Sequence, residues 1–204
     1  MKNIRCAGYL LAITSLFLCS CVSTKLTSVW KDEIYFGWPE RKIIVIGAFN
    51  APGVRRLFEE EIVRQLKLRG TDAVASHNLI SSDALPKYEK VESLVKEQGA
   101  DAVLITHFIG KKKTETVTRR KEIRTPRALA ETWQEYYMQG YPEMPGHTGE
   151  REYYRLETDM YEVGTDRPIW QVISETCVEG PVPQKYQELV AVMLKKMHQD
   201  KMIR

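Results

Sequence analysis

The sequence predicts a mixed α/β fold with a β-α-β-α-β parallel core, an antiparallel hairpin and a C-terminal helix. Two continuous β-branched runs, residues 42–49 (KIIVIGAF) and 101–109 (DAVLITHFI), are typical of strands buried on both faces. Helical periodicity separates these runs, and two alternating segments follow at 152–163 and 169–177. Short crossovers between such strands imply parallel pairing with right-handed connections.

The parallel core is expected to hold two helices and one further short strand. Asn50 and Pro52 supply a cap and a first-turn proline for the first helix, which Gly70 ends. Its apolar stripe consists of Val54, Leu57, Phe58, Ile62 and Leu66. A short strand at 73–76 comes next, and a second helix then runs from about Ser82 or Asp83 to Gly99.

The C-terminal third is expected to form the hairpin and the last helix. A turn at 164–168 joins the two alternating segments, and Pro181 and Pro183 end the second one. Alternation along the second segment puts Trp170 on a definite face, where we expect it to pack in the core. The helix is predicted by the spacing of Tyr186, Leu189, Val190, Met193 and Met197.

The first twenty residues read as an export signal. Lys2 and Arg5 precede an apolar run at 6–18, which is too short to span a bilayer as a mature helix. The run ends in Leu18-Cys19-Ser20-Cys21, which resembles the lipobox of bacterial lipoproteins, with cleavage before Cys21 and lipidation of its thiol. The alternatives are an ordinary secretory signal or a buried apolar helix.

The chain is therefore divided into a signal peptide at 1–20, a lipidated tether at 21–28 and a single α/β domain at 29–204. In lipoproteins of this kind an Asp after the lipidated cysteine favours the inner membrane. Val22 stands there instead, so the resemblance implies the outer membrane, with the domain facing the periplasm.

Charge and cysteine content limit the remaining functions. The chain has 30 basic and 27 acidic residues, and removal of Lys2 and Arg5 leaves an excess of one positive charge, which gives no overall case for nucleic acid. Of the four cysteines, two leave with the signal peptide and Cys21 carries lipid. Cys177 then has no intramolecular disulfide partner. We expect it to be buried and inert, the alternatives being a reactive thiol or an intermolecular disulfide.

A basic and aromatic excursion at 110–150 interrupts the domain without a convincing core pattern. Loops longer than about 15 residues inside compact domains are usually functional or disordered. Its candidate recognition residues are Lys111, Lys112, Lys113, Arg119, Arg120, Trp133, Tyr136, Tyr137 and Tyr141. Such residues suit an envelope protein, a glycan or an anionic lipid, and the periplasm excludes nucleic acid. The alternative is a solvated loop whose aromatic residues pack back on the domain.

No catalytic, metal or cofactor site is expected from sequence motifs. The segment 47–53 follows a strand and opens a helix, yet it is neither G-x-G-x-x-G nor a Walker A loop. Arg55 and Arg56 read as a solvated pair, the alternative being a phosphate site at that helix end. The carboxylates at 59–61 suit the helix dipole better than acid–base work. The four histidines have no ligand spacing, and His107 reads as a buried core residue.

Several motifs resemble a family of uncharacterised Gram-negative outer-membrane lipoproteins. They are Thr27-Ser-Val-Trp30 with Tyr35, the strand at 42–47, Phe58-Glu59, Gly99-Ala-Asp-Ala-Val-Leu104 and the hairpin with Ile169-Trp170 and Ser174-Glu-Thr176. The resemblance implies a small α/β domain similar to those of the curli-secretion group and the amino-terminal domain of TolB. It carries no known activity and transfers no functional residues.

Two functions follow from the sequence. The first is a membrane-anchored, non-enzymatic module for binding or envelope assembly. The alternative is a hydrolase or nucleotide-handling enzyme with its site at the strand ends near 47–53. A buried cluster of titratable groups at 47–53 would favour the enzyme, and an exposed groove beside the excursion would favour the binding module.

Overall fold

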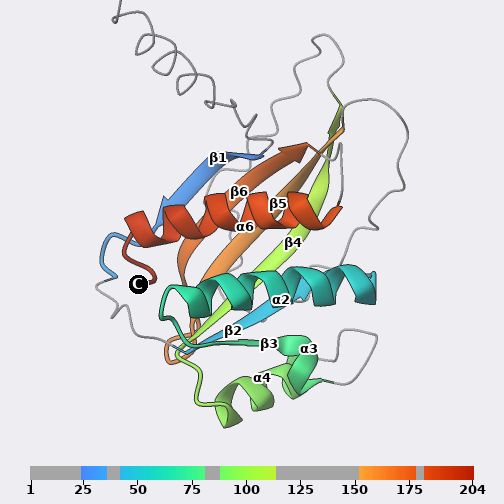
Figure 1. Ribbon diagram of the computed structural model, residues 1–204. Coiled ribbons are helices and arrows are strands. Elements are labelled where there is room, and N and C mark those ends of the chain that lie inside the picture. The colour runs from blue at the N-terminus through green and yellow to red at the C-terminus, as the bar shows by residue number, and fades with distance from the viewer. Residues whose placement is uncertain (1–23, 36–41, 81–87, 114–151, 178–181) are drawn as a thin grey trace, which may run out of the picture.

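The computed structural model describes residues 24–35, 42–80, 88–113, 152–177 and 182–204 (Figure 1). Within these ranges one six-stranded sheet has the order β1-β6-β5-β4-β2-β3. The mixed α/β class predicted from the sequence is confirmed. No helix among the described residues is long and apolar enough to cross a membrane.

The parallel core consists of β2 (Ile43–Ala48), β3 (Ala73–Ala75) and the first half of β4 (Ala102–Lys113). β2 lies between the other two and pairs parallel with both, from Ile43↔Ala73 to Ala48↔His107. All six residues of β2 are buried, as its β-branched sequence predicts. The crossovers contain α2 (Pro52–Leu68) and α4 (Tyr88–Glu97), and a short helix not predicted, α3 (Ser76–Leu79), follows β3 directly.

The antiparallel half is built on the predicted hairpin of β5 (Glu152–Glu162) and β6 (Arg167–Cys177). β5 pairs with β4, and β6 pairs on its other side with β1 (Thr24–Lys31). β1 corrects the sequence interpretation of 21–28 as a tether, because residues 24–28 belong to a strand of the sheet. Only Thr24 among its residues is fully buried, and the apolar Val29 is exposed, so hydrophobic pattern alone did not identify the strand.

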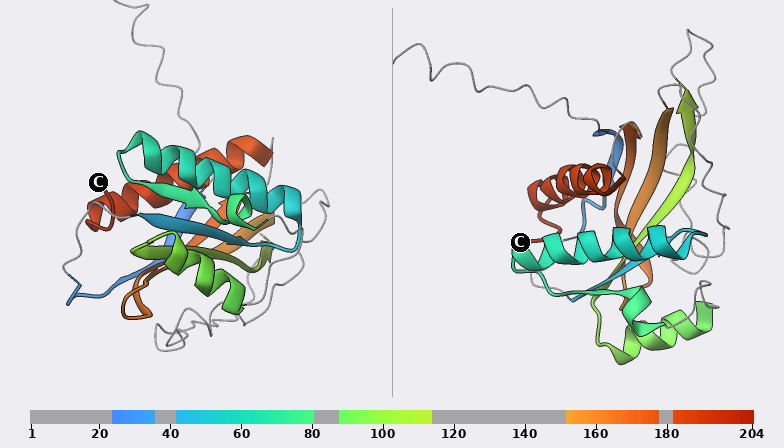
Figure 2. Two further views of the ribbon diagram at one scale, coloured as in Figure 1. Left: turned by 90° about the horizontal axis from the view of Figure 1, so that it is seen from below. Right: turned by 45° about the vertical axis from the view of Figure 1, so that its right-hand side comes forward.

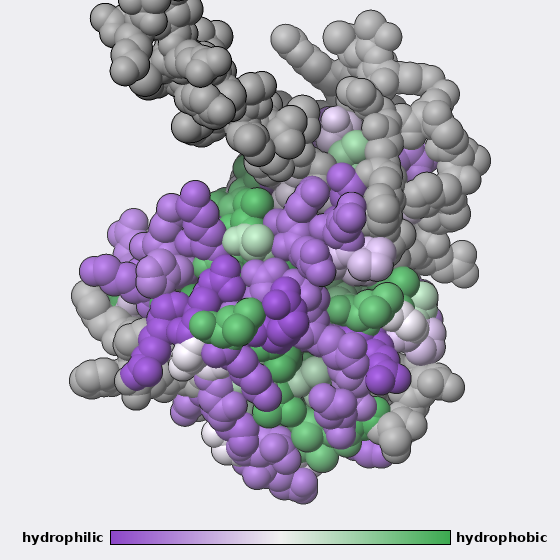
Figure 3. All heavy atoms as spheres, viewed as in Figure 1, coloured by the Kyte–Doolittle hydropathy of each residue, from purple (hydrophilic) through white to green (hydrophobic). Residues whose placement is uncertain are grey.

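Helices cover the two faces of the sheet unequally (Figure 2). α2 and α6 (Val182–Gln199) pack on one face, where the main core contains Phe58, Trp170 and Met193. α4 packs on the other face with a smaller core around Ile44, Ile46 and Val103. Seen from the side of α2 and α6, the surface is mainly hydrophilic, and its apolar areas are separate (Figure 3).

β4 is longer than the sequence indicated and runs to Lys113. Its register shifts between Phe108 and Gly110, and Gly110 has a φ of 145°, a conformation that residues with a Cβ rarely adopt. Beyond this irregularity Lys111, Lys112 and Lys113 pair with Tyr154, Tyr153 and Glu152. The excursion interpreted as 110–150 therefore begins after Lys113, and 114–151 lies outside the described residues.

Four strand ends meet at one end of the sheet, which we call the proximal end (Figure 1). β1 starts there, with Thr24 opposite Thr176 near the end of β6. Cys177 lies opposite Tyr153 at the start of β5, and Lys113 at the end of β4 lies opposite Glu152. The start of the described chain and both sides of segment 114–151 thus share one end of the sheet.

Candidate functional site

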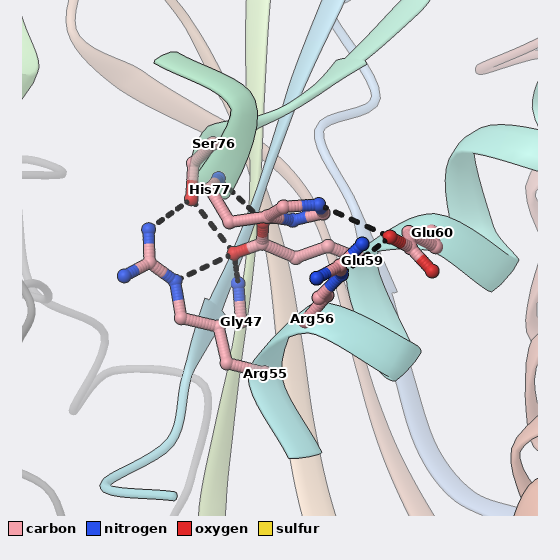
Figure 4. A network of polar contacts seen from close by, with 7 residues as sticks. All are labelled: Gly47, Arg55, Arg56, Glu59, Glu60, Ser76 and His77. Atoms are coloured by element: carbon pink, nitrogen blue, oxygen red, sulfur yellow. Dashed lines mark hydrogen bonds and ion pairs between the residues drawn. The ribbon is translucent and has the colours of Figure 1, made fainter. Parts of the chain in front are cut away.

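Polar side chains cluster at the carboxyl ends of the parallel strands (Figure 4). Gly47 is near the end of β2, while Ser76 and His77 open α3 immediately after β3. Arg55 and Glu59 come from the first two turns of α2. Because β2 and β3 are parallel, their carboxyl ends and the helices that follow meet at one edge, where ligands of α/β proteins commonly bind.

Glu59 is the centre of this cluster and is 0% exposed. Its Oε1 accepts hydrogen bonds from the backbone N–H of Gly47 at 2.8 Å, from Arg55 Nε at 3.0 Å and from Ser76 Oγ at 2.7 Å. Arg55 also donates to Ser76 Oγ at 2.8 Å, and its side chain is 3% exposed. The buried carboxylate thus has a buried guanidinium as its counterion.

The second oxygen of Glu59 binds His77. Oε2 accepts the backbone N–H of His77 at 2.8 Å and lies 2.8 Å from its Nδ1. A carboxylate only accepts hydrogen bonds, so Nδ1 of His77 is the donor in this contact. Five donors therefore converge on one carboxylate, from β2, α2 and the start of α3.

Gly47 fits this arrangement because it has no side chain. A Cβ there would lie 3.1 Å from the ring of Phe49 and 3.5 Å from Cγ of Glu59. The contact with the Phe49 ring would be tight, whereas the contact with Glu59 would be an ordinary van der Waals distance.

The outer edge of the cluster is charged and accessible. His77 Nε2 lies 3.4 Å from Oε1 of Glu60 without a well-aligned hydrogen bond, and Arg56 Nε donates to the same oxygen at 2.9 Å. The hydrogen bond from Arg56 lowers the pKa of Glu60, with smaller contributions from the charges of Arg56 and His77. Glu60 and Arg56 have side-chain exposures of 47% and 70%, so solvent screens both.

These positions correct two sequence interpretations. Arg55 is buried and not part of a solvated pair, and Glu59 binds five donors in the core and is not a surface carboxylate at a helix terminus. Helix geometry contained a signal that could have located both residues. Positions 55, 59, 62 and 66 lie on one helical face, so the Arg–Glu pair falls on the same stripe as Ile62 and Leu66.

The geometry limits the chemistry of this cluster. Ser76 Oγ donates to Glu59 and accepts from Arg55, and no Ser76–His77 hydrogen bond is present among the contacts of the cluster. A nucleophilic serine needs a base within hydrogen-bond reach of its hydroxyl. Glu59 is no better placed as a base, because its oxygens are occupied by donors. Among the described residues, no three His, Cys, Asp or Glu side chains are arranged to hold a metal ion.

The residues predicted for recognition divide into two groups. Lys111 and Lys112 lie in β4 and form ion pairs, Lys111 with Glu152 at 2.8 Å and Lys112 with Glu175 at 3.2 Å. They are thus part of the sheet and not of a loop, a correction that also applies to the backbone of Lys113. Arg119, Arg120, Trp133, Tyr136, Tyr137, Tyr141 and the lipidation residue Cys21 lie outside the described residues.

His107 and Cys177 can be compared directly with their sequence interpretations. His107 is 4% exposed, which confirms it as a buried strand residue, and burial lowers its pKa to about 4. Cys177 is a free cysteine at the end of β6 and is partly exposed, so it is less buried than expected.

Comparison with known proteins gives distant structural likenesses only. No protein-family model and no curated protein matches the chain. The fold is similar to a single-substitution variant of the PelC dodecamer from Paraburkholderia phytofirmans, at a TM-score of 0.49 and 10% identity over 82% of this chain and 94% of that one. The PelC dodecamer of the same organism in another crystal form gives a TM-score of 0.48 at 10% identity, with the same coverage of both chains.

Lipoprotein GNA1162 of Neisseria meningitidis gives a TM-score of 0.42 at 9% identity, over 78% of this chain and 98% of that one. With TM-scores below 0.5, these likenesses do not assign the chain to a family.

Proposed function

We propose that the chain is a lipoprotein anchored through Cys21, which acts as a non-catalytic binding module on the periplasmic face of the outer membrane. The lipobox Leu18-Cys19-Ser20-Cys21 supports the anchor. The observation that carries the binding role is the proximal end, where β1 starts and where both sides of segment 114–151 are held by the pair Lys113↔Glu152.

The start of β1 limits how far the domain can stand from the lipid. A fully extended chain spans at most about 3.3–3.6 Å per residue. From Cys21 to Thr24 the chain therefore reaches no more than about 11 Å. With lipid on Cys21, the proximal end is the part of the domain that faces the membrane.

Segment 114–151 leaves the sheet at that same end. Its basic and aromatic composition suits an envelope protein, a glycan or an anionic lipid. Loops that carry binding residues are typically held by a rigid scaffold. Here the scaffold is the long β4–β5 pair, and recognition is directed at partners close to the membrane surface.

The alternative is a hydrolase or nucleotide-handling enzyme at the strand ends. The buried cluster around Glu59 lies where such a site would be, and a buried cluster of titratable groups at this place favours the alternative. Its connectivity favours a structural role instead. Each Glu59 oxygen is occupied by donors, and the hydroxyl of Ser76 donates to this occupied carboxylate and not to His77. Nε2 of His77 faces the partly exposed Glu60.

Expression in a Gram-negative host with an alkyne-labelled fatty acid tests the anchor. Wild-type protein should incorporate the label and float with outer-membrane vesicles, whereas Cys21→Ser should do neither. Cys177→Ser is the matched control and should behave as wild type. Labelling and flotation of Cys21→Ser at the wild-type level would reject the proposal.

Cross-linking in intact envelopes tests the binding role. A variant in which a Gly-Ser linker replaces 114–151, with Lys113 and Glu152 retained, should keep its lipid and lose the cross-linked partners. Capture of the same partners by this variant would place recognition elsewhere. A His77→Ala variant should capture the same partners as wild type. This result would separate the binding role of segment 114–151 from any function of the Glu59 cluster.

A further inference from the structure

Three cationic side chains surround one carboxylate at the proximal end of the sheet. Lys25 Nζ and Lys112 Nζ each lie 3.2 Å from Oε2 of Glu175, and Arg155 Nε lies 3.6 Å from Oε1. The three cations come from β1, β4 and β5, and Glu175 belongs to β6, which pairs with both β1 and β5. Segments far apart in the chain thus converge on one charged cluster.

The four side chains lie on one face of the sheet. Lys25, Glu175 and Arg155 are direct cross-strand partners, which point to the same side. Lys112 pairs with Tyr153, two positions from Arg155 along β5, and so joins them. Trp170 and Val172 of β6 have the opposite parity and pack in the core with α2 and α6, so the cluster is on the other face.

The cluster carries a surplus of positive charge. Burial alone would raise the pKa of Glu175, but hydrogen bonds and charges of Lys25 and Lys112 outweigh it and lower that pKa. The carboxylate is therefore ionised at neutral pH, and it balances one of the three cations. Its side chain is 7% exposed, against 62% for Lys25, 52% for Lys112 and 34% for Arg155, so solvent meets mainly the cations.

The position of the cluster restricts the anion that it meets. Lys25 directly follows Thr24, so the limit of about 11 Å between Cys21 and Thr24 also keeps this lysine close to the lipid. Phosphate groups of phospholipids are the anions that lie at that depth over the whole membrane surface. Lys supplies point charges for phosphate, and Arg can add paired N–H donors.

We propose that Lys25, Lys112 and Arg155 form a binding site for the phosphate groups of anionic phospholipids in the membrane that carries the anchor. The site rests on the proposed lipidation of Cys21, and it orients the domain with the proximal end of this sheet face towards the headgroups. Glu175 is a positioning residue, since it gathers three cations from three strands while leaving their net charge positive.

Amine footprinting of the full lipidated protein tests the site. The protein is reconstituted into vesicles of phosphatidylcholine alone or of phosphatidylcholine and phosphatidylglycerol at two to one, then treated with a water-soluble acetylating reagent. Mass spectrometry measures acetylation of each lysine. Lys96 on α4 is the internal control, because its side-chain exposure of 64% matches the 62% of Lys25.

Acetylation of Lys25 and Lys112 should fall roughly fivefold in the anionic vesicles at low salt, the factor expected for a basic residue at an anionic surface. It should recover at about 0.5 M salt, where charge attraction is screened. Lys96 should react equally in both vesicles. Lys25→Gln should reduce the protection of Lys112, and the matched variant Lys96→Gln should leave it unchanged.

Equal acetylation of Lys25 and Lys112 in both vesicle types would overturn the proposal. Equal protection by inorganic phosphate in phosphatidylcholine vesicles would also overturn it, because the ligand would then be a soluble anion. Protection found only in native envelopes would overturn it as well, because the ligand would then be a protein or glycan. Flotation distinguishes failure of the phosphate site from failure of the proposed anchor. A protein that fails to float with phosphatidylcholine vesicles lacks the lipid, whereas one that floats without protection has the anchor and not the site.

Discussion

His77 binds the carboxylate of Glu59 twice, through its backbone N–H and through Nδ1, each at 2.8 Å. This double contact joins the start of α3 to the second turn of α2, across the end of β2. Since Glu59 also accepts from Gly47 and Arg55, one side chain connects three elements at the edge of the parallel core.

Glu59→Gln should destabilise the domain strongly. The substitution removes a buried negative charge, leaves the Arg55 guanidinium unpaired and places amide hydrogens against existing donors. Loss of one partner of a buried ion pair typically costs about 3–5 kcal/mol. Urea denaturation should show this loss, while Glu60→Gln, at an exposed neighbour, should change the unfolding free energy by less than about 1 kcal/mol. Similar stabilities for the two variants would contradict the structural role.

Trp170→Ala should also lower stability. Trp170 is 0% exposed and donates from Nε1 to Oδ2 of Asp200 at 2.8 Å, next to the end of α6. Truncation of a large buried aromatic residue typically costs about 3–5 kcal/mol. Trp170→Phe keeps most of the volume and loses the hydrogen bond, so its cost should be clearly smaller. A melting temperature of Trp170→Ala close to wild type would refute the packing described for β6 and α6.

Stability should depend on pH through His107. Burial lowers its pKa from 6.5 to about 4, so between these values the unfolded chain takes up a proton that the folded domain does not. The unfolding free energy should therefore fall as pH drops from about 6.5 to about 4, by up to roughly 3 kcal/mol. His107→Gln removes this contribution but keeps those of the carboxylates. Identical pH slopes for wild type and variant would contradict the assignment.

Two linker replacements should differ in stability. A Gly-Ser linker in place of 114–151 leaves β4 intact, and its thermal melt should match wild type. The same linker in place of 110–151 removes four residues of β4 and the ion pair between Lys111 and Glu152, so it should melt at a lower temperature. Equal circular-dichroism melts would mean that the end of β4 contributes nothing to the fold.

The central strands could be predicted because their information is local. The run at 43–48 is apolar at nearly every position, and the hairpin at 152–177 alternates around a clear turn. Such patterns predict burial directly, because each residue can be interpreted from its neighbours in the sequence. The parallel pairing among β2, β3 and β4 followed from the short crossovers.

The missed features depend on partners distant in sequence. Lys111 and Lys112 look like loop residues until Glu152 and Glu175 are placed opposite them. β1 becomes a strand only when β6 provides its hydrogen bonds. Glu59 reads as a surface carboxylate because its donors Ser76 and His77 come from another element, although its spacing from Arg55 and Ile62 pointed inward.

The place of β1 in the sheet sets an order of assembly. Thr24 and Thr176 share a side-chain hydrogen bond across 152 positions of sequence, and β6 is the strand with which β1 pairs in the described sheet. A chain is synthesised amino terminus first, so its earliest strand waits until the latest hairpin has formed. Closing so long a loop is slow because chain entropy opposes it. Until then β1 and the open edge of β6 expose unpaired backbone, the kind of edge that invites pairing with other chains. The sheet is therefore completed last at the edge that β1 forms, and molecules that have not yet closed this edge are the most vulnerable to misassociation.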